Sequence, residues 1–201
     1  MRKLGIYLVT IGIAILGFYL IYNKSIDARN NEDMNKYIEE TSIVNEQPEE
    51  IVKTDQSENT TKENYNITYT AILEIPKISL KRGVVDSTKN FKSINYAISV
   101  DNSSQYPNEN GNFILYSHSG NSNIAFFNRL NNLELNDDIY VYYNGIKYRY
   151  SVRNKYDIEK TGKAKVISRK DDKYITLITC DQNKKGFQIV IEGKLIDEVN
   201  Y

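Results

Sequence analysis

Residues 174–180 read Tyr-Ile-Thr-Leu-Ile-Thr-Cys, an apolar-rich run that ends on the only cysteine of the chain. Residues 113–119 read Phe-Ile-Leu-Tyr-Ser-His-Ser, a second such run that carries the only histidine. Short runs rich in β-branched and aromatic residues are typical of strands. One thiol and one imidazole, each at a strand end, are the minimum side chains for nucleophilic catalysis by cysteine.

Outward from these two runs, further short apolar segments predict a mainly β domain. The dipeptide Asn144-Gly145 between two β-rich runs predicts a hairpin. In its second arm Tyr148, Tyr150 and Val152 alternate with polar residues, which indicates one buried face. Apolar residues at helical spacing predict a short helix over residues 124–133. The expected strands cover residues 69–75, 78–85, 94–100, 112–117, 138–143, 146–153, 174–180 and 187–196. About eight strands with one or two short helices favour a closed β-barrel, in which closure removes the sheet edges.

The N-terminal segment predicts a membrane anchor. Residues 4–22 contain no charged side chain. At about 1.5 Å per residue, a helix of this length roughly spans a hydrocarbon core of ~30 Å. The alternative is a cleaved signal peptide, but that would have a shorter apolar region followed by small residues. Arg2 and Lys3 precede the span, which favours an N-terminus inside the cell and a domain outside it. We therefore assign residues 1–24 to a single-pass anchor.

Residues 25–64 predict a stalk. They hold 11 acidic and 4 basic residues, and such a segment buries too little apolar surface to offset the entropy lost on folding. We expect disorder here, with a helix around residues 31–40 as the alternative. Residues 65–201 form the expected catalytic domain.

Charge and cysteine content exclude several functions. The chain has 26 acidic and 26 basic residues, and residues 65–201 hold 19 basic and 15 acidic ones. This balance argues against nucleic-acid binding, which normally requires a clustered basic face. A single cysteine excludes an intramolecular disulfide and a metal site made of several cysteines.

Cysteine attacks as a thiolate, and His118 is the only imidazole that could assist Cys180, which lies 62 positions later. The alternatives are a small buried cysteine and an ordinary loop histidine. An idle thiol on the outside of a cell is liable to oxidation, which favours a catalytic role.

These residues resemble a known family. The string Thr-Leu-Ile-Thr-Cys at 176–180 is similar to the signature of sortases, the cysteine transpeptidases of Gram-positive cell surfaces. The run from Gly111 to His118 resembles the sortase strand that leads into the catalytic histidine, and Phe-Phe-Asn-Arg-Leu at 126–130 resembles the short helix after it. The resemblance covers about residues 70–197. Papain-like enzymes place cysteine before histidine, the reverse of the order here.

The resemblance implies that Cys180 is the nucleophile and His118 the acid and base. Sortases usually carry an arginine on the last strand, and aligning that strand puts Gln188 at its position. Glutamine keeps a hydrogen-bond donor but lacks the charge and the bidentate fork. Lys184 or Lys185 in the preceding loop are candidates to restore the charge. Ser119-Gly120 differs from the arginine or asparagine more common after the sortase histidine and so leaves the subclass open; we expect a class B- or D-like member.

The resemblance also implies partners. An extended sorting signal of LPxTG type would dock in a groove whose floor includes Tyr116, Ile178 and Thr179, with core packing as the alternative for Ile178. Cleavage would form a thioacyl intermediate on Cys180. An amine of a peptidoglycan precursor or of a pilin would then resolve it at the cell membrane.

No cofactor and no metal are expected. Some sortases bind calcium, and the segment between residues 153 and 174 contains Glu159, Asp171 and Asp172. We interpret these as solvated loop charges, with a calcium site as the alternative.

Two other functions remain open. One is an extracellular cysteine peptidase that releases its product to water. The other is a catalytically weak sortase-like module that binds peptides without turnover, which the glutamine at position 188 makes credible.

Overall fold

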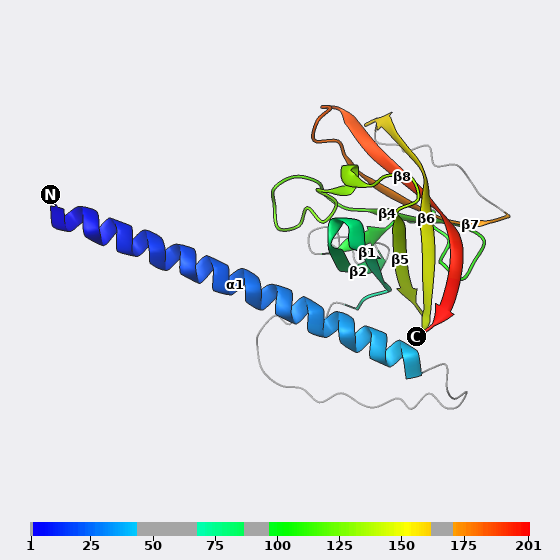
Figure 1. The fold of residues 1–201 in the computed structure, drawn as a ribbon, viewed down its shortest axis with the longest axis horizontal. Helices are drawn as coiled ribbons and strands as arrows, with labels where there is room; N and C mark the ends of the chain where they lie inside the picture. Colours follow the sequence, from blue (N-terminus) through cyan, green and yellow to red (C-terminus); the bar gives the residue numbers. More distant parts are fainter. Residues whose placement is uncertain (1, 44–67, 87–96, 162–170) are drawn as a thin grey trace.

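The computed structural model describes residues 2–43, 68–86, 97–161 and 171–201. These residues form one long helix, α1 (Arg2–Ile43), and eight strands. Two 3₁₀ turns, η1 and η3, lie between them (Figure 1). The strands are β1 (Ala71–Ile75), β2 (Leu80–Asp86), β3 (Ile98–Val100), β4 (Gly111–Tyr116), β5 (Asp138–Tyr143), β6 (Ile146–Glu159), β7 (Lys173–Cys180) and β8 (Phe187–Asn200). The turns are η1 (Pro76–Ile78) and η3 (Leu130–Asn132).

The eight strands close into a barrel in the order β1-β2-β3-β4-β7-β8-β6-β5, with β5 pairing back to β1. This confirms the predicted closed, mainly β fold. Two of the pairs, β2 with β3 and β4 with β7, are parallel. The other pairs are antiparallel. The parallel pair in the middle of the order matters for function, because it brings the ends of β4 and β7 to the same end of the barrel.

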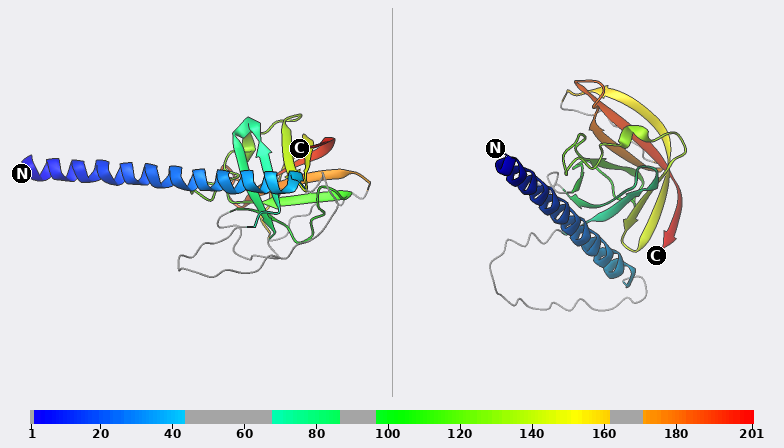
Figure 2. Two further views of the ribbon diagram at one scale, coloured as in Figure 1. Left: turned by 90° about the horizontal axis from the view of Figure 1, so that it is seen from below. Right: turned by 60° about the vertical axis from the view of Figure 1, so that its left-hand side comes forward.

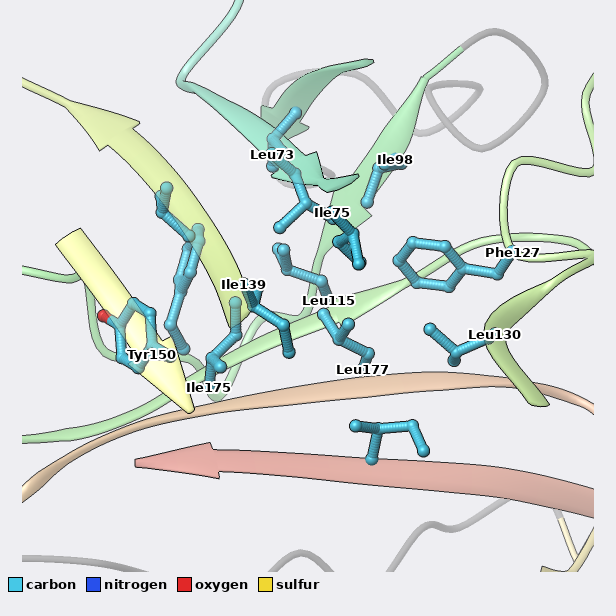
Figure 3. Packing of buried hydrophobic residues seen from close by; sticks show 14 of the residues in the cluster. Leu73, Ile75, Ile98, Leu115, Phe127, Leu130, Ile139, Tyr150, Ile175 and Leu177 are labelled. Carbon is cyan, nitrogen blue, oxygen red and sulfur yellow. The ribbon is translucent and has the colours of Figure 1, made fainter. Parts of the chain in front are cut away.

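The barrel interior is a single apolar core (Figure 3). Alternate residues of each strand point inward, as the period-2 patterns predicted. Each Leu, Ile or Phe side chain that leaves water completely contributes about 1.5–3 kcal/mol. The largest fully buried side chains of this core include Leu73, Ile75, Ile98, Phe113, Leu115, Phe127, Leu130, Leu133, Tyr148 and Tyr150.

The predicted hairpin is confirmed. Asn144 and Gly145 have φ angles of 49° and 75°, as a tight turn with two left-handed residues requires. The turn joins β5 to β6, with Tyr143 opposite Ile146. In β6, Tyr148, Tyr150 and Val152 are buried as expected.

Several strand bounds differ from the expectation. Strand β2 starts at Leu80 rather than at residue 78, because Pro76 opens the turn η1 and Ser79 adopts a left-handed φ of 52°. Strands β6 and β8 run further than predicted, since they pair with each other along almost their whole length. The first part of the strand expected at residues 94–100 lies outside the described residues.

The helix predicted for residues 124–133 is wrong. The segment forms successive tight turns, of which only η3 is helical. The backbone N–H of Phe127 donates to the carbonyl of His118 at 3.0 Å, and that of Leu130 donates to Phe127 at 3.1 Å. The N–H of Phe127 thus bonds to a residue nine positions earlier instead of to the carbonyl four positions earlier that an α-helix would require. Phe127, Leu130 and Leu133 are buried, and their spacing of three suits 3₁₀ geometry.

Helix α1 continues well past the apolar run, which corrects the prediction of a disordered stalk for residues 25–43. Met34 is 1% exposed, and the Tyr37 hydroxyl donates to the carbonyl of Thr70 at 2.6 Å. Asp27 forms a 2.8 Å ion pair with Arg82 on β2. Extending an existing helix costs little, whereas starting one is expensive. The apolar segment therefore nucleates helix α1, and docking on the barrel stabilises the part of the helix that follows it. Residues 44–64 lie outside the described residues.

The N-terminal half of α1 projects away from the barrel (Figure 1, Figure 2). The span Tyr7–Ser42 is long and apolar enough to cross a membrane, with a mean hydropathy of 1.5 in its most apolar window, none of which is buried. Tyr7, Leu16 and Phe18 are among its exposed side chains. A helix of this kind fits a single-pass anchor.

Candidate active site

The pairing of β4 with β7 brings the only histidine and the only cysteine together. Tyr116 lies opposite Ile178 in the register, and the N–H of Ser117 donates to the carbonyl of Ile178 at 3.4 Å. Extending this parallel register by two residues puts His118 level with Cys180, the last residue of β7. Both residues are partly exposed, so solvent and substrate can reach this end of the barrel.

Hydrogen bonds hold the two strand ends in place. The Ser119 hydroxyl donates to the carbonyl of Cys180 at 2.6 Å. The carbonyl of His118 accepts from the N–H of Phe127 at 3.0 Å, and Phe127 itself is buried in the core. The backbone on both sides of the thiol–imidazole pair is thereby tied to rigid parts of the barrel. Catalysis benefits from such positioning, because misplaced groups react slowly.

Gln188 lies beside Cys180 at the same end of the barrel. It lies directly opposite Cys180 in the antiparallel pair of β7 and β8, and opposite Ile158 of β6 on its other side. Side chains of directly opposed residues share one face of a sheet. The fold therefore places Cys180 and Gln188 on the neighbouring strands β7 and β8, and His118 two residues past the end of the adjacent β4. A catalytic role of Gln188 stays a prediction.

Lys160 was not among the site residues predicted from the sequence. Its ammonium nitrogen Nζ lies 3.3 Å from the Cys180 sulfur Sγ. Lys184, by contrast, lies 3.8 Å from the Asp157 carboxylate and 3.5 Å from the centre of the Phe187 ring. A prediction that continued this strand past Arg153 could have identified Lys160, because the longer strand ends beside the start of β8, next to Cys180.

The predicted groove residues separate into two faces. Tyr116 and Ile178 lie on the same face of the sheet as Cys180, where Tyr116 packs against the cluster that contains Ile178. Thr179 points to the barrel interior and is 3% exposed. The Thr179 hydroxyl donates to the carbonyl of Ser117 at 2.9 Å, so it braces the two strand ends. The apolar cluster on the face of Cys180 consists of Ile114, Tyr116, Tyr156, Ile158, Ile178 and Val190.

A pocket of about 190 Å³ opens beside Cys180, and its wall is rich in carboxamide side chains. The Gln182 amide donates to the carbonyl of Asn128 at 3.0 Å and so joins two parts of that wall. The remaining lining comes mainly from Ser119, Phe127, Asn131, Asn132, Thr179, Asp181, Asn183 and Ile189.

The described residues hold no group of three or more His, Cys, Asp or Glu side chains arranged to bind a metal ion. Glu159 and Asp171 are exposed. The Asp172 carboxylate accepts a 2.8 Å hydrogen bond from Lys194, and this bond raises the pKa of that lysine. Residues 162–170 of the same segment lie outside the described part of the chain.

A sequence model of the sortase domain matches residues 73–196, more than half of the chain, and the chain therefore belongs to the sortase family. This membership supports a transpeptidase of the sortase type. No curated protein matches the chain significantly.

Solved structures share the fold. A sortase D5 transpeptidase from Clostridium perfringens is 21% identical, with a TM-score of 0.57 over 64% of this chain and 79% of that one. Listeria monocytogenes sortase A is 23% identical, with a TM-score of 0.57 over 66% and 90%. Sortase C1 from Streptococcus agalactiae is 21% identical, with a TM-score of 0.59 over 68% and 71%. These neighbours belong to several sortase classes and single out none, so the class B- or D-like assignment stays a prediction.

Proposed function

We propose that this protein is a membrane-anchored, extracellular cysteine transpeptidase that cleaves an LPxTG-like sorting signal and transfers the acyl group to an amine. One observation carries the proposal. The parallel register of β4 and β7 sets the only histidine level with the only cysteine, at an accessible end of a sortase barrel.

The first half of the reaction follows from these two residues. The Cys180 thiolate attacks the threonine carbonyl carbon, a C–S bond forms, and the carbonyl π electrons move onto oxygen as an oxyanion. When the oxyanion collapses, the peptide C–N bond breaks. The His118 imidazolium gives its proton to the leaving amine. Cys180 is then a thioester of the sorting signal.

The second half regenerates the enzyme. An incoming amine attacks the thioester carbonyl, and His118 accepts the proton that this amine loses. The new C–N bond forms as the C–S bond breaks, and Cys180 leaves as thiolate. Gln188 on β8 is positioned beside Cys180 to donate a hydrogen bond to the substrate carbonyl or the oxyanion.

The apolar cluster around Tyr116 and Ile178 supports the peptide-binding part of the proposal. It lies along β4, β7, β8 and β6 on the face of Cys180, where an extended peptide could lie beside the nucleophile. Thr179 supports the site from below through its bond to Ser117. The acceptor would be an amine of a peptidoglycan precursor or of a pilin.

Helix α1 supports the location. The barrel contacts the helix from Asn23 onward, where the Asn123 amide lies 3.4 Å from the Asn23 side-chain oxygen. Asn23 directly follows the apolar run of residues 4–22. With the N-terminus inside, as Arg2 and Lys3 favour, the loop after His118 would face the outer membrane surface closely.

The test uses the full chain in detergent, incubated with a library of LPxTG-like peptides, with and without an amine acceptor. Intact-mass spectrometry should show an acyl adduct on Cys180 and, with the amine, an amide product. The matched control is the Cys180→Ala protein, which should form neither. Release of free acid alone, even with abundant amine, would favour a peptidase. Binding of peptides without any adduct would favour a peptide-binding module.

A further inference from the structure

The Cys180 sulfur has a cationic neighbour from a strand two positions away in the barrel. Lys160 follows the last residue of β6, and β8 separates β6 from β7 in the barrel order. The lysine side chain therefore reaches across β8 to place Nζ 3.3 Å from Sγ. Residues from β8 and from the end of β6 thus lie on one side of the thiol, and His118, which follows β4, lies on the other side.

A hydrogen bond to the neighbouring strand holds the backbone of Lys160 in place. Its N–H donates to the carbonyl of Gly186 at 2.8 Å, which continues the β6–β8 pairing in which Glu159 opposes Phe187 and Ile158 opposes Gln188. Because side chains alternate along a strand, Lys160 emerges on the face of Ile158 and Gln188. Gly186 has no side chain, so this position adds no bulk beside the lysine.

The charge of Lys160 is available to the sulfur. Within the described residues, no carboxylate lies within 4.0 Å of its ammonium, whereas Lys184 is drawn to Asp157 at 3.8 Å. A positive charge beside a thiol favours the thiolate, which is the reactive form. The oxyanion also forms on the carbon bonded to this sulfur, within the reach of the same ammonium.

We propose that Lys160 is a catalytic residue that supplies positive charge to the Cys180 sulfur and to the oxyanion formed on the acyl carbon attached to it. Lys160 forms no covalent bond in either half of the reaction. Gln188 contributes a neutral donor from β8, and the lysine contributes the charge from β6. The role in acyl transfer rests on the proposed function, whereas the effect on the sulfur can be measured without any peptide.

The first experiment measures alkylation of Cys180 in the full chain by two reagents of similar size, anionic iodoacetate and neutral iodoacetamide. A change in the amount of thiolate alters both rates alike, so their ratio reports the local charge. In the Lys160→Met protein the iodoacetate-to-iodoacetamide ratio should fall about fivefold, the effect of one unit charge at ~4 Å in water. The Lys160→Arg protein should restore most of the ratio.

The matched control is Lys147→Met, which removes the same charge from the other end of β6. Lys147 lies 4.3 Å from the centre of the Tyr140 ring, far along the strand from Cys180. This variant should keep the wild-type ratio. A ratio that is equal in the wild-type, Lys160→Met and Lys147→Met proteins would overturn the proposal.

The second experiment separates this inference from the proposed function. With a peptide that acylates the wild-type protein, Lys160→Met should slow acylation by about 10–100-fold, a loss at or below that of one oxyanion donor. Wild-type acylation by this variant would overturn the role in acyl transfer. If no peptide acylates the wild-type protein but the alkylation ratio falls as expected, the proposed function fails while the action of Lys160 on the sulfur stands.

Discussion

Docking of helix α1 on the barrel gives a stability prediction that the amino-acid pattern alone did not suggest. Met34 is 1% exposed although the surrounding segment is polar, and it lies between Asp27 and Tyr37, which bond to Arg82 and to Thr70. Truncating a buried methionine to alanine costs about 2–5 kcal/mol in a core. Here the cost has an upper limit, because a weakened helix can leave the barrel without unfolding it. We therefore expect about 2 kcal/mol for Met34→Ala, the low end of that range.

For a chain of this size, 1 kcal/mol corresponds to about 2–4 °C in Tm. The Met34→Ala protein, full length and in detergent, should thus melt about 4–8 °C below the wild type. Near-ultraviolet circular dichroism of the barrel tyrosines is a suitable signal, because it reports tertiary packing rather than helix content.

The control is Lys36→Ala, two residues away on the same helix. The Lys36 side chain is 73% exposed and only pairs with Glu40 at 3.7 Å, and exposed substitutions of this kind usually change stability by less than about 0.5 kcal/mol. Equal melting temperatures for the Met34→Ala and Lys36→Ala proteins would refute docking of α1 as a source of barrel stability.

Four further outcomes are expected. Cys180→Ala should abolish the thioacyl adduct, and His118→Ala should reduce acylation nearly as much, since each group is useless without the other. Both proteins should keep the wild-type circular dichroism spectrum. Turnover by the Cys180→Ala protein would contradict the mechanism. Gln188→Ala should slow acylation by roughly 10–100-fold in stopped-flow assays, while Gln188→Arg should at least preserve the rate. An unchanged rate in the Gln188→Ala protein would contradict a catalytic role of Gln188. Burial raises the pKa of Tyr69 and of Tyr106 to about 12, so the folded state favours their neutral forms. Denaturant titrations should therefore show this contribution to stability in full below pH ~10 and its loss between pH ~10 and ~12. Constant stability across that interval would argue against buried phenols. Protease added to intact cells should remove the barrel and leave α1 in the membrane, whereas full protection until lysis would exclude an outward-facing domain.

Much of this protein was predictable from its sequence because local patterns carry the information. The period-2 alternation at Tyr148, Tyr150 and Val152 depends only on which face of a strand leaves water, and the structure buries all three. The Asn144-Gly145 turn depends on the few residues that tolerate a positive φ. The apolar run at residues 4–22 needs only its own length to predict a spanning helix.

Other features depended on contacts between distant segments. The helix expected at residues 124–133 gave way to tight turns because Phe127 bonds to His118, just past the end of β4. Residues 25–43 are helical since Asp27 and Tyr37 bond to Arg82 and Thr70, which lie far along the chain. Neither partner can be recognised from a window of neighbouring residues.

The active site shows the same division. The sequence by itself determined that Cys180 lies at the end of one strand and His118 just past the end of another, because each apolar run stops at these positions. Only the tertiary structure decided that these strands are parallel neighbours, which sets the two residues level, and that β6 runs far enough along β8 to bring Lys160 to the sulfur. The physical reason is that strand order and register are fixed by closure of the whole barrel, in which every strand must satisfy two neighbours at once.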